Sequence, residues 1–501
     1  MSDSVDTVSE AFTLQREDMQ LTHDLMGGTK AMVMAGIRYI PREPGEDEES
    51  WRIRLERTVL FNVYKRTVRY MGGRVFEKSV VLGEDAENGV DDRYADFVED
   101  VDKQGHNLTI WSRPVFEGGI NDGVVFCVVD FHHMETRYVN GKLQYLRADG
   151  TWADKTEAAD KENAWSPYFI HVPAENVLDA RMEWRNGKPV ITHFRYIETI
   201  EQQDGVWKTS TYQQIRAFLY NNEGKPVWQV WDNRENSGST GQFVLRGEGE
   251  FSLSVLPVAW FMPGEKRTPL TAEPALIDLA QLNKRHWQAT SSQYELMEYV
   301  RRPPWFGRKL GEFDDKTGKR KITFAPGLLC NADDESAALQ SVGVDAGSVA
   351  AGRQELQDLE NSMAIYGLQL LQPKTGVVTA TESQRDAEEN NSTLKTWALQ
   401  FQDFLENCMR LVALWWGYDD GPSVNVNTDF AKYLDVSFLL DLFRERSIST
   451  YTFLGLLKNL GVLPDDFNID EEILRLSRDP MTNAGTTGVT SLAQRLGMSG
   501  I

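Results

Sequence analysis

Few residue patterns in this chain of 501 residues suggest catalysis. An apolar, strand-like segment is followed by His132, His133 and Glu135, residue types that can bind a metal ion. A histidine pair with one carboxylate at a strand end is more often structural or solvent-exposed than a metal centre. The carboxylates at 91–92 and 46–49 are of the type that nucleases use, but their acidic, loop-like surroundings favour solvated side chains.

The motifs of phosphate binding and hydrolysis are absent from the sequence. A nucleotide-driven motor needs GxxxxGK[ST], and the Gly-Gly-Thr-Lys of residues 27–30 lacks that spacing. HExxH and GxSxG do not occur, and residues 497–500 give only a fragment of the second. Cys127, Cys330 and Cys408 are widely spaced and odd in number, which favours a reducing compartment without a disulfide framework. We therefore predict a protein without a catalytic centre, metal ion or cofactor.

One segment is basic although the chain as a whole is acidic. The net charge is −22 and the pI about 4.9, so the surface as a whole is unsuited to gripping phosphates. Between residues 301 and 321, however, basic residues outnumber acidic ones. This band could meet DNA or a partner protein, or it could be a solvated hairpin. Its members are Arg301, Arg302, Arg308, Lys309, Lys316, Lys319, Arg320 and Lys321.

A second polar candidate is the short segment 372–380. It contains one charged residue, Lys374, together with the hydroxyl groups of Thr375 and Thr379. Lysine contacts with phosphates are weak and screened by salt, which suits a surface that slides along DNA. An ordinary linker between two helices would have the same composition.

Apolar residues spaced by three and four predict helices on both sides of this segment. We expect one helix at 346–371 and a longer one at 380–416, whose length would be roughly 55 Å. An earlier helix over 273–300 should end before Pro303-Pro304. The two apolar series are Leu356, Leu359, Met363, Tyr366 and Leu370, and then Leu394, Trp397, Phe401, Phe404, Cys408, Leu411 and Trp415.

The first part of the chain also has helical patterns. Residues 8–40 read as helical with an interruption at Gly27-Gly28. A helix over 51–71 would be capped by Ser50 and ended by Gly72-Gly73. Residues 92–117 read as one further helix.

A β-rich region and a small helical region complete an α+β fold. Short stretches of β-branched and aromatic residues with turn-like pairs between them predict hairpins over 124–260. Residues 417–480 read as helical, with Ser449 as a cap, and the tail from Pro480 is expected to be loosely ordered. The longest apolar runs, such as 124–129, are too short to span a bilayer.

Five local strings, in this order, resemble the portal proteins of tailed double-stranded-DNA bacteriophages over about residues 15–480. They are Gly28-Thr29-Lys30-Ala31 with Tyr39-Ile40-Pro41 and Arg66-Thr67-Val68; Trp165-Ser166-Pro167-Tyr168 with Asn186-Gly187-Lys188; Leu256-Pro257-Val258 with Ala275-Leu276-Ile277-Asp278-Leu279-Ala280-Gln281-Leu282-Asn283; Thr379-Ala380-Thr381-Glu382; and Asn427-Thr428-Asp429-Phe430 with Ser447-Ile448-Ser449 and Leu460-Gly461-Val462-Leu463-Pro464.

The resemblance implies a portal-type fold made of successive parts. They would be an α/β wing at 1–272, a first stem helix at 273–300, a clip at 301–345, a second stem helix at 346–371, a channel loop at 372–380, a long helix at 381–416, and a helical crown with a flexible tail at 417–501.

It also implies a structural role in a virion. The family forms rings, typically of twelve subunits, at one capsid vertex, and DNA enters and leaves through the channel. The expected partners are the packaging terminase, the major capsid protein and a tail adaptor, with assembly in the host cytoplasm and no membrane. Lys374, Thr375 and Thr379 would then face DNA. Two alternatives remain: another ring-forming head or tail component, and a hydrolase, which the 14 tryptophans suggest.

Overall fold

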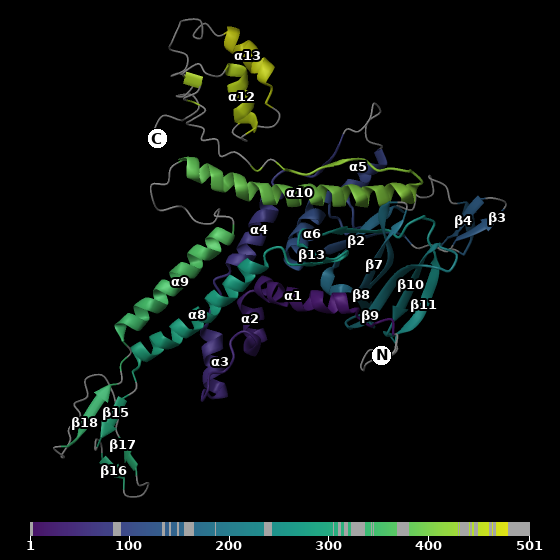
Figure 1. Cartoon of the computed structure of the whole chain (residues 1–501). Helices are drawn as coiled ribbons and strands as arrows, with labels where there is room; N and C mark the ends of the chain where they lie inside the picture. The colour runs from purple at the N-terminus through teal and green to yellow at the C-terminus, as the bar shows by residue number, and fades with distance from the viewer. Residues whose placement is uncertain are drawn as a thin grey trace. The chain divides into compact units, whose positions relative to one another are not determined.

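The chain divides into two compact units, residues 1–428 and 429–501, in a computed structural model (Figure 1). Each unit is described by itself. The described residues are 4–83, 92–132, 136–139, 142–147, 150–154, 165–185, 187–234, 243–303, 305–308, 312–314, 319–321, 336–341, 343, 345–367, 380–428, 430, 440, 443–444, 449–459, 463 and 467–478.

The larger unit contains both helices and antiparallel sheets, which confirms the α+β class. Its described helices are α1 (Glu10–Gly27), α2 (Thr29–Ala35), α3 (Glu48–Arg57), α4 (Val63–Val75), α5 (Asp92–Glu99), α6 (Leu108–Asp122), α8 (Ile277–Arg301), α9 (Ala346–Tyr366) and α10 (Ala380–Trp416). Its described strands are β1 (Val81–Leu82), β2 (Val125–Phe131), β3 (Thr136–Val139), β4 (Lys142–Leu146), β5 (Trp152–Asp154), β6 (Pro167–Pro173), β7 (Val177–Arg185), β8 (Lys188–Gln203), β9 (Thr209–Tyr220), β10 (Pro226–Asp232), β11 (Val244–Glu250), β12 (Val258–Phe261), β13 (Glu265–Thr268), β14 (Thr271–Glu273), β15 (Trp305–Arg308), β16 (Glu312–Asp314), β17 (Lys319–Lys321), β18 (Ala338–Ser341) and β19 (Val424–Asn425).

The helices near the N-terminus differ from the predicted ones in one place. The interruption at 27–28 is confirmed, because α1 ends and α2 begins on either side of Gly28, whose φ is +76°. The single helix predicted over 51–71 is wrong. Asp47, not Ser50, caps α3, and the side chain of Asn62 accepts a hydrogen bond from the Lys65 amide to start α4. The chain therefore turns at 58–62.

Two further local predictions are wrong for reasons of packing and capping. Helix α4 continues through Gly72-Gly73 to Val75. Gly72 is instead a point of close contact, since a Cβ there would overlap the side chain of Glu117 on α6. The helix predicted over 92–117 is interrupted at 100–107. The Asn107 side chain accepts from the Ile110 amide and begins a new helix, α6.

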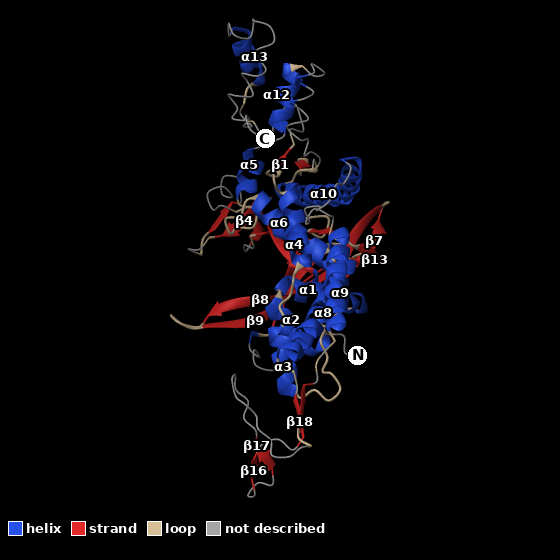
Figure 2. Ribbon diagram, turned by 90° about the vertical axis from the view of Figure 1, so that its left-hand side faces the viewer, coloured by secondary structure: helices blue, strands red, loops and turns tan. Residues whose placement is uncertain are grey.

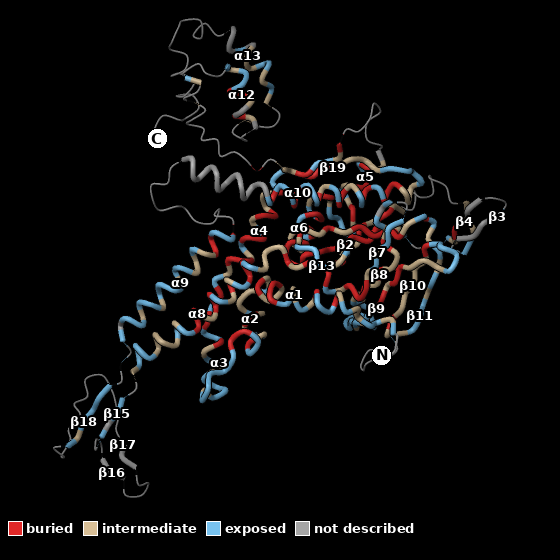
Figure 3. The backbone as a smooth tube through the Cα atoms, viewed as in Figure 1, coloured by how far each residue is buried: buried red, intermediate tan, exposed pale blue. Residues whose placement is uncertain are grey.

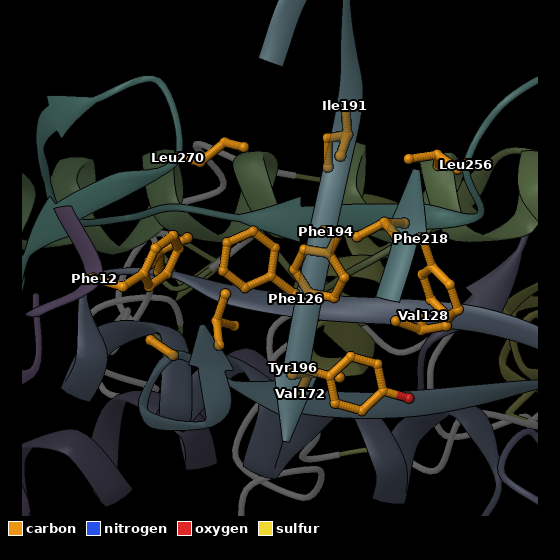
Figure 4. Close-up of a cluster of buried hydrophobic side chains, with 14 of the residues drawn as sticks. Phe12, Phe126, Val128, Val172, Ile191, Phe194, Tyr196, Phe218, Leu256 and Leu270 are labelled. Atoms are coloured by element: carbon orange, nitrogen blue, oxygen red, sulfur yellow. The ribbon is translucent and has the colours of Figure 1, made fainter. Parts of the chain in front are cut away.

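The β-rich region forms two main sheets around an aromatic core. One sheet has the strand order β11-β10-β9-β8-β7, and the other has the order β12-β2-β6. Phe126 of β2 and Phe194 of β8 meet with ring centroids 5.1 Å apart, and Phe12 of α1 lies 6.2 Å from Phe126 (Figure 4). Helix α1 and both sheets thus share one buried cluster.

Helix α10 packs on the β12-β2-β6 sheet. The predicted apolar stripe is confirmed, since its members from Leu394 to Leu411 are buried. Phe401 lies 5.0 Å from Phe261 of β12 and 5.4 Å from Phe116 of α6, measured between ring centroids. The indole of Trp415 donates to the carbonyl of Val129 on β2 at 2.9 Å. The long helix is therefore part of the core.

A short strand pair joins segments that are far apart in the sequence. Val81 pairs with Asn425 and Leu82 with Val424, so β1 and β19 form an antiparallel ladder. The segment 417–428, which was grouped with the crown in the sequence, belongs to the larger unit.

The smaller unit contains α12 (Thr450–Asn459) and α13 (Ile469–Arg478) among its described residues. The Ser449 hydroxyl accepts from the Thr452 amide at 3.2 Å, which confirms the predicted cap. Lys458 donates to the Phe467 carbonyl at 3.0 Å and ties the end of α12 to the start of α13.

A histidine between two carboxylates joins α1, α6 and the turn before β7. The His23 Nε2 lies 2.7 Å from Asp122 Oδ1, and its Nδ1 lies 3.2 Å from Glu175 Oε2. Burial lowers the pKa of His23, but the two carboxylates outweigh burial and raise that pKa to about 10. The imidazolium is therefore the form that the fold stabilises.

We expect the free energy of unfolding to fall at alkaline pH, because His23 then loses its proton and this site no longer stabilises the fold. Because the folded pKa is about 10 and the unfolded value 6.5, its contribution is complete below pH 6.5 and is lost as the pH rises toward 10. His23→Gln should lower the free energy of unfolding by about 1–3 kcal/mol at pH 6 and by much less at pH 10. Urea unfolding at both pH values measures the difference. An equal loss at the two pH values would contradict the assignment.

Candidate functional site

Helices α8 and α9 form an antiparallel hairpin, which we call the α8–α9 hairpin. Arg285 pairs with Glu355 at 2.8 Å, and farther along the Gln293 side chain donates to the Val349 carbonyl at 3.3 Å. The helix predicted over 273–300 begins at Ile277, because 271–273 belong to strand β14. The helix predicted over 346–371 reaches Tyr366, and residues 368–379 lie outside the described part of the chain.

The first half of α8 is anchored in the core. The buried Asn283 accepts from the Tyr64 amide at 2.9 Å and donates to the Phe61 carbonyl at 3.0 Å. The buried indole of Trp287 donates to the Thr58 carbonyl at 3.2 Å. These contacts satisfy the backbone of the turn at 58–62, where helical hydrogen bonding stops. The hairpin therefore projects from a fixed base.

Helix α3 supports the second half of α8 through charged groups. The well-buried side chains of Arg54 and Glu46 form an ion pair at 2.7 Å, and the Arg54 guanidinium lies 3.9 Å from Glu295. Arg57 lies 3.9 Å from Glu298. Between the two helices is an open cleft of about 990 Å³. This cleft leaves one flank of the hairpin accessible.

Apolar side chains on the second half of α8, in the half of the hairpin next to the strand insertion, are exposed. Tyr294, Tyr299 and Val300 each leave nearly half of their surface in solvent (Figure 3). At the opposite end of the hairpin, Ile365 and Tyr366 of α9 leave more than half. Tyr366 belongs to the apolar series predicted for the helix at 346–371, yet its side chain is exposed in the single chain. Exposed apolar side chains gathered on one element mark a surface for association.

The segment between the two helices contains two antiparallel strand pairs (Figure 2). Strand β15 pairs with β18 next to the helices, and Trp305 and Phe306 of β15 are exposed. Strand β16 pairs with β17, and the register sets residues 312 and 314 opposite 321 and 319. The acidic residues of β16 therefore face the basic ones of β17 across the ladder.

The basic band predicted over 301–321 is only partly described. Arg301, Arg302 and Arg308 are exposed, and Arg301 lies 3.6 Å from Glu298. Lys319, Arg320 and Lys321 form strand β17, for which the backbone is described. Lys309 and Lys316 lie outside the described residues.

Most of the other candidate residues fall outside the described part of the chain. Lys374, Thr375 and Thr379 lie outside the described residues, as do His133 and Glu135. His132 stacks on Trp165 with ring centroids 6.1 Å apart. The thiols of Cys127 and Cys408 are free and buried, and burial raises the pKa of Cys408.

No group of three His, Cys, Asp or Glu side chains with a metal-binding arrangement occurs in the described part of the chain. Among the helices described here, none combines the length and apolarity needed to cross a bilayer.

Comparison with known proteins gives one family match and several structural neighbours. A family model described as a domain of unknown function (DUF4055) matches residues 275–416, which contain the α8–α9 hairpin and α10. No curated protein matches the chain. Neither the family description nor the neighbours' titles name an enzyme.

The structural neighbours are virion and neck structures of a gene transfer agent (GTA). A chain of the virion of the native GTA particle is 9% identical, with 87% of this chain and 99% of that chain covered and a TM-score of 0.37. A chain of the native neck, computed with C12 symmetry, is 9% identical, with 85% and 98% covered and a TM-score of 0.36. A chain of the empty-particle neck, computed with C6 symmetry, is 12% identical, with 86% and 98% covered and a TM-score of 0.36.

Proposed function

We propose that this chain is a portal subunit. Copies of it close into a ring, with twelve as the expected number, at one vertex of a phage-like capsid. Double-stranded DNA passes through the central channel during packaging and ejection. The protein has no catalytic step of its own and works by assembling and by guiding DNA.

The observation that carries this proposal is the exposed half of the α8–α9 hairpin. An isolated subunit leaves Tyr294, Tyr299 and Val300 in water although the base of the same helix is buried. Burial of such a surface against neighbouring copies would favour assembly. The order helix, strand insertion, antiparallel helix and long helix agrees with the five sequence strings that resemble portal proteins.

The parts of the chain can be given roles on this proposal. The α8–α9 hairpin is the stem, the strands at 305–341 are the clip, and residues 372–380 are the loop that lines the channel. Exposed Arg301, Arg302 and Arg308 at the clip would meet DNA, the packaging terminase or a tail adaptor. The acidic remainder would keep the duplex mobile, because strong phosphate binding would resist movement at each step.

The proposal is tested by imaging the purified full-length protein. Mass photometry should detect a single large oligomer, and negative-stain images should show rings with a central hole. A particle that remains monomeric at every concentration would rule out a portal. Another ring-forming head or tail component would also give rings, so the position of the ring in assembled particles decides between the two.

A role for Lys374 can be tested within the assembled particle. We expect Lys374→Ala to leave ring assembly intact and to alter the length or retention of packaged DNA, because one weak phosphate contact per subunit is removed. The packaged length is read from DNA extracted from purified particles. Lys284→Ala, on α8, is a control for loss of one positive charge. Unchanged packaging in the Lys374 variant would reject the role.

A further inference from the structure

Strands β8 and β9 extend beyond their sheet as a free two-stranded ribbon, which we call the β8–β9 arm. Strand β7 pairs with β8 only as far as Tyr196, and β10 pairs with β9 only from Gln214 onward. The register between β8 and β9 nevertheless continues to Gln203 opposite Thr209. Figure 2 shows the two strands running outward side by side. Beyond Glu198 and Gln214, which pair with each other, no third strand of the described structure pairs with the ribbon.

The tip of the arm carries an almost fully exposed indole. Residues 201–209 are exposed throughout, and Trp207 leaves 97% of its surface in solvent beside the exposed Val206. Isolated two-stranded hairpins are marginally stable in water. An exposed Trp at the end of such a ribbon therefore points to a partner that covers it.

The charge of the arm defines what that partner must present. Glu201 and Asp204 flank the tip, and Lys208 is the basic residue between the tip and β9. All three are exposed. The arm therefore combines an apolar tip with excess negative charge, and it fits a surface that is apolar and basic.

The same chain has basic and apolar groups near the starts of α2 and α4, a region that we call the α2–α4 junction. The Leu60 amide donates to Thr29 Oγ1 at 3.3 Å, and Lys65 Nζ donates to the Met26 carbonyl at 2.6 Å. The first bond ties the segment before α4 to the first residue of α2, and the second ties the first turn of α4 to the last turn of α1.

Exposed cations and exposed apolar groups lie within five residues of these two bonds along the chain. Lys30, Arg66 and Arg69 are exposed, and none has an ion-pair partner among the described residues. Met34, which leaves 79% of its surface in solvent, stands one turn after Lys30, and Phe61 of the turn before α4 is also exposed. The junction is thus basic and apolar within an acidic chain.

We propose that the β8–β9 arm of one subunit docks on the α2–α4 junction of the next copy of this chain. Trp207 would lie against Met34 and Phe61, and Glu201 and Asp204 would pair with Arg66 and Arg69. Such a contact joins two different surfaces, so it is heterologous and repeats around a closed ring. This inference rests on the proposed ring and adds a second contact between neighbouring subunits, outside the stem.

Site-specific cross-linking tests the contact directly. The photo-reactive amino acid p-benzoylphenylalanine replaces Trp207, and rings are assembled from a mixture of isotopically light and heavy chains. Mass spectrometry should find light-to-heavy cross-links from position 207 to residues 26–37 or 58–70. The same amino acid at Trp184, an exposed residue of strand β7 outside the arm, should not reach these segments.

Charge exchange provides an independent test. Glu201→Lys with Asp204→Lys should raise the concentration needed for half-assembly about ten-fold, and Arg66→Glu with Arg69→Glu should do the same. Combining all four substitutions should bring that concentration back toward the wild-type value. Unchanged assembly in both pairs, or a combined variant no better than either pair, overturns the arm contact.

The outcomes separate this inference from the proposed function. A monomeric wild-type protein would remove both. Rings in which position 207 cross-links elsewhere on the chain, or particles in which it cross-links to a different protein, would leave the ring in place and remove only the arm contact.

Discussion

Replacing Trp397 with proline is expected to abolish the folded state. Proline at this position removes a hydrogen bond inside α10 and clashes with the preceding turn, which costs about 3 kcal/mol or more. The same change removes a buried indole, and losses of that kind cost about 3–5 kcal/mol. Together these costs are similar to the whole stability of many domains. Circular dichroism and the soluble yield of the full-length variant would measure the loss.

A control on the same helix makes this result specific. Leu399 lies two residues on and is exposed, so Leu399→Ala should change the free energy of unfolding by no more than about 0.5 kcal/mol. If the Trp397→Pro variant instead gave soluble, intact rings, α10 could not be continuous through this position.

Replacing Trp287 with alanine is expected to give the second largest loss, about 3–5 kcal/mol in the free energy of unfolding. Its indole is completely buried and donates to the Thr58 carbonyl, so the change leaves both a cavity and an unpaired backbone group. Chemical denaturation of the purified protein gives the value. A loss below about 1 kcal/mol would mean that the base of the α8–α9 hairpin is not anchored at this point.

Tyr294→Ala on the same helix is the matched control. Its ring is exposed in the single subunit, so unfolding of the dissociated chain should change by about 0.5 kcal/mol or less. If the exposed half of the hairpin is covered by neighbouring copies, the same variant should assemble into rings only at higher concentration. An unfolding loss as large as that of Trp287→Ala would show that the two halves of α8 are equally buried.

The long helices could be predicted from sequence because their pattern is local. In α10, residues such as Trp397, Phe401 and Phe404 recur every three or four positions, and burial of one stripe against β12 follows directly. Gly72-Gly73 shows where local reasoning stops. Glycine commonly ends helices, but here the helix continues, and Gly72 instead leaves room for a side chain of α6 that no local pattern reveals.

The candidate site was predictable in part for the same reason. The basic residue types at 301–321 are visible in the sequence, but their register opposite residues 312 and 314 depends on strand pairing. The exposure of Tyr294 could not be predicted, because helical spacing does not say what lies beside a helix. Nothing in the sequence around Asn283 indicates that its side-chain amide bonds to the Tyr64 amide and the Phe61 carbonyl, because these partners lie more than 200 residues earlier in the chain.

The ladder between β1 and β19 has a consequence for how the protein is made. Strand β1 can pair only after β19 has been synthesised, because Val81 and Leu82 pair with Asn425 and Val424. The larger unit therefore cannot be completed until most of the chain has left the ribosome. At about 5–20 residues per second this delay lasts roughly 20–70 seconds. Nascent subunits are therefore exposed to chaperones and proteases for that time, and truncated translation products should not be able to join an assembly.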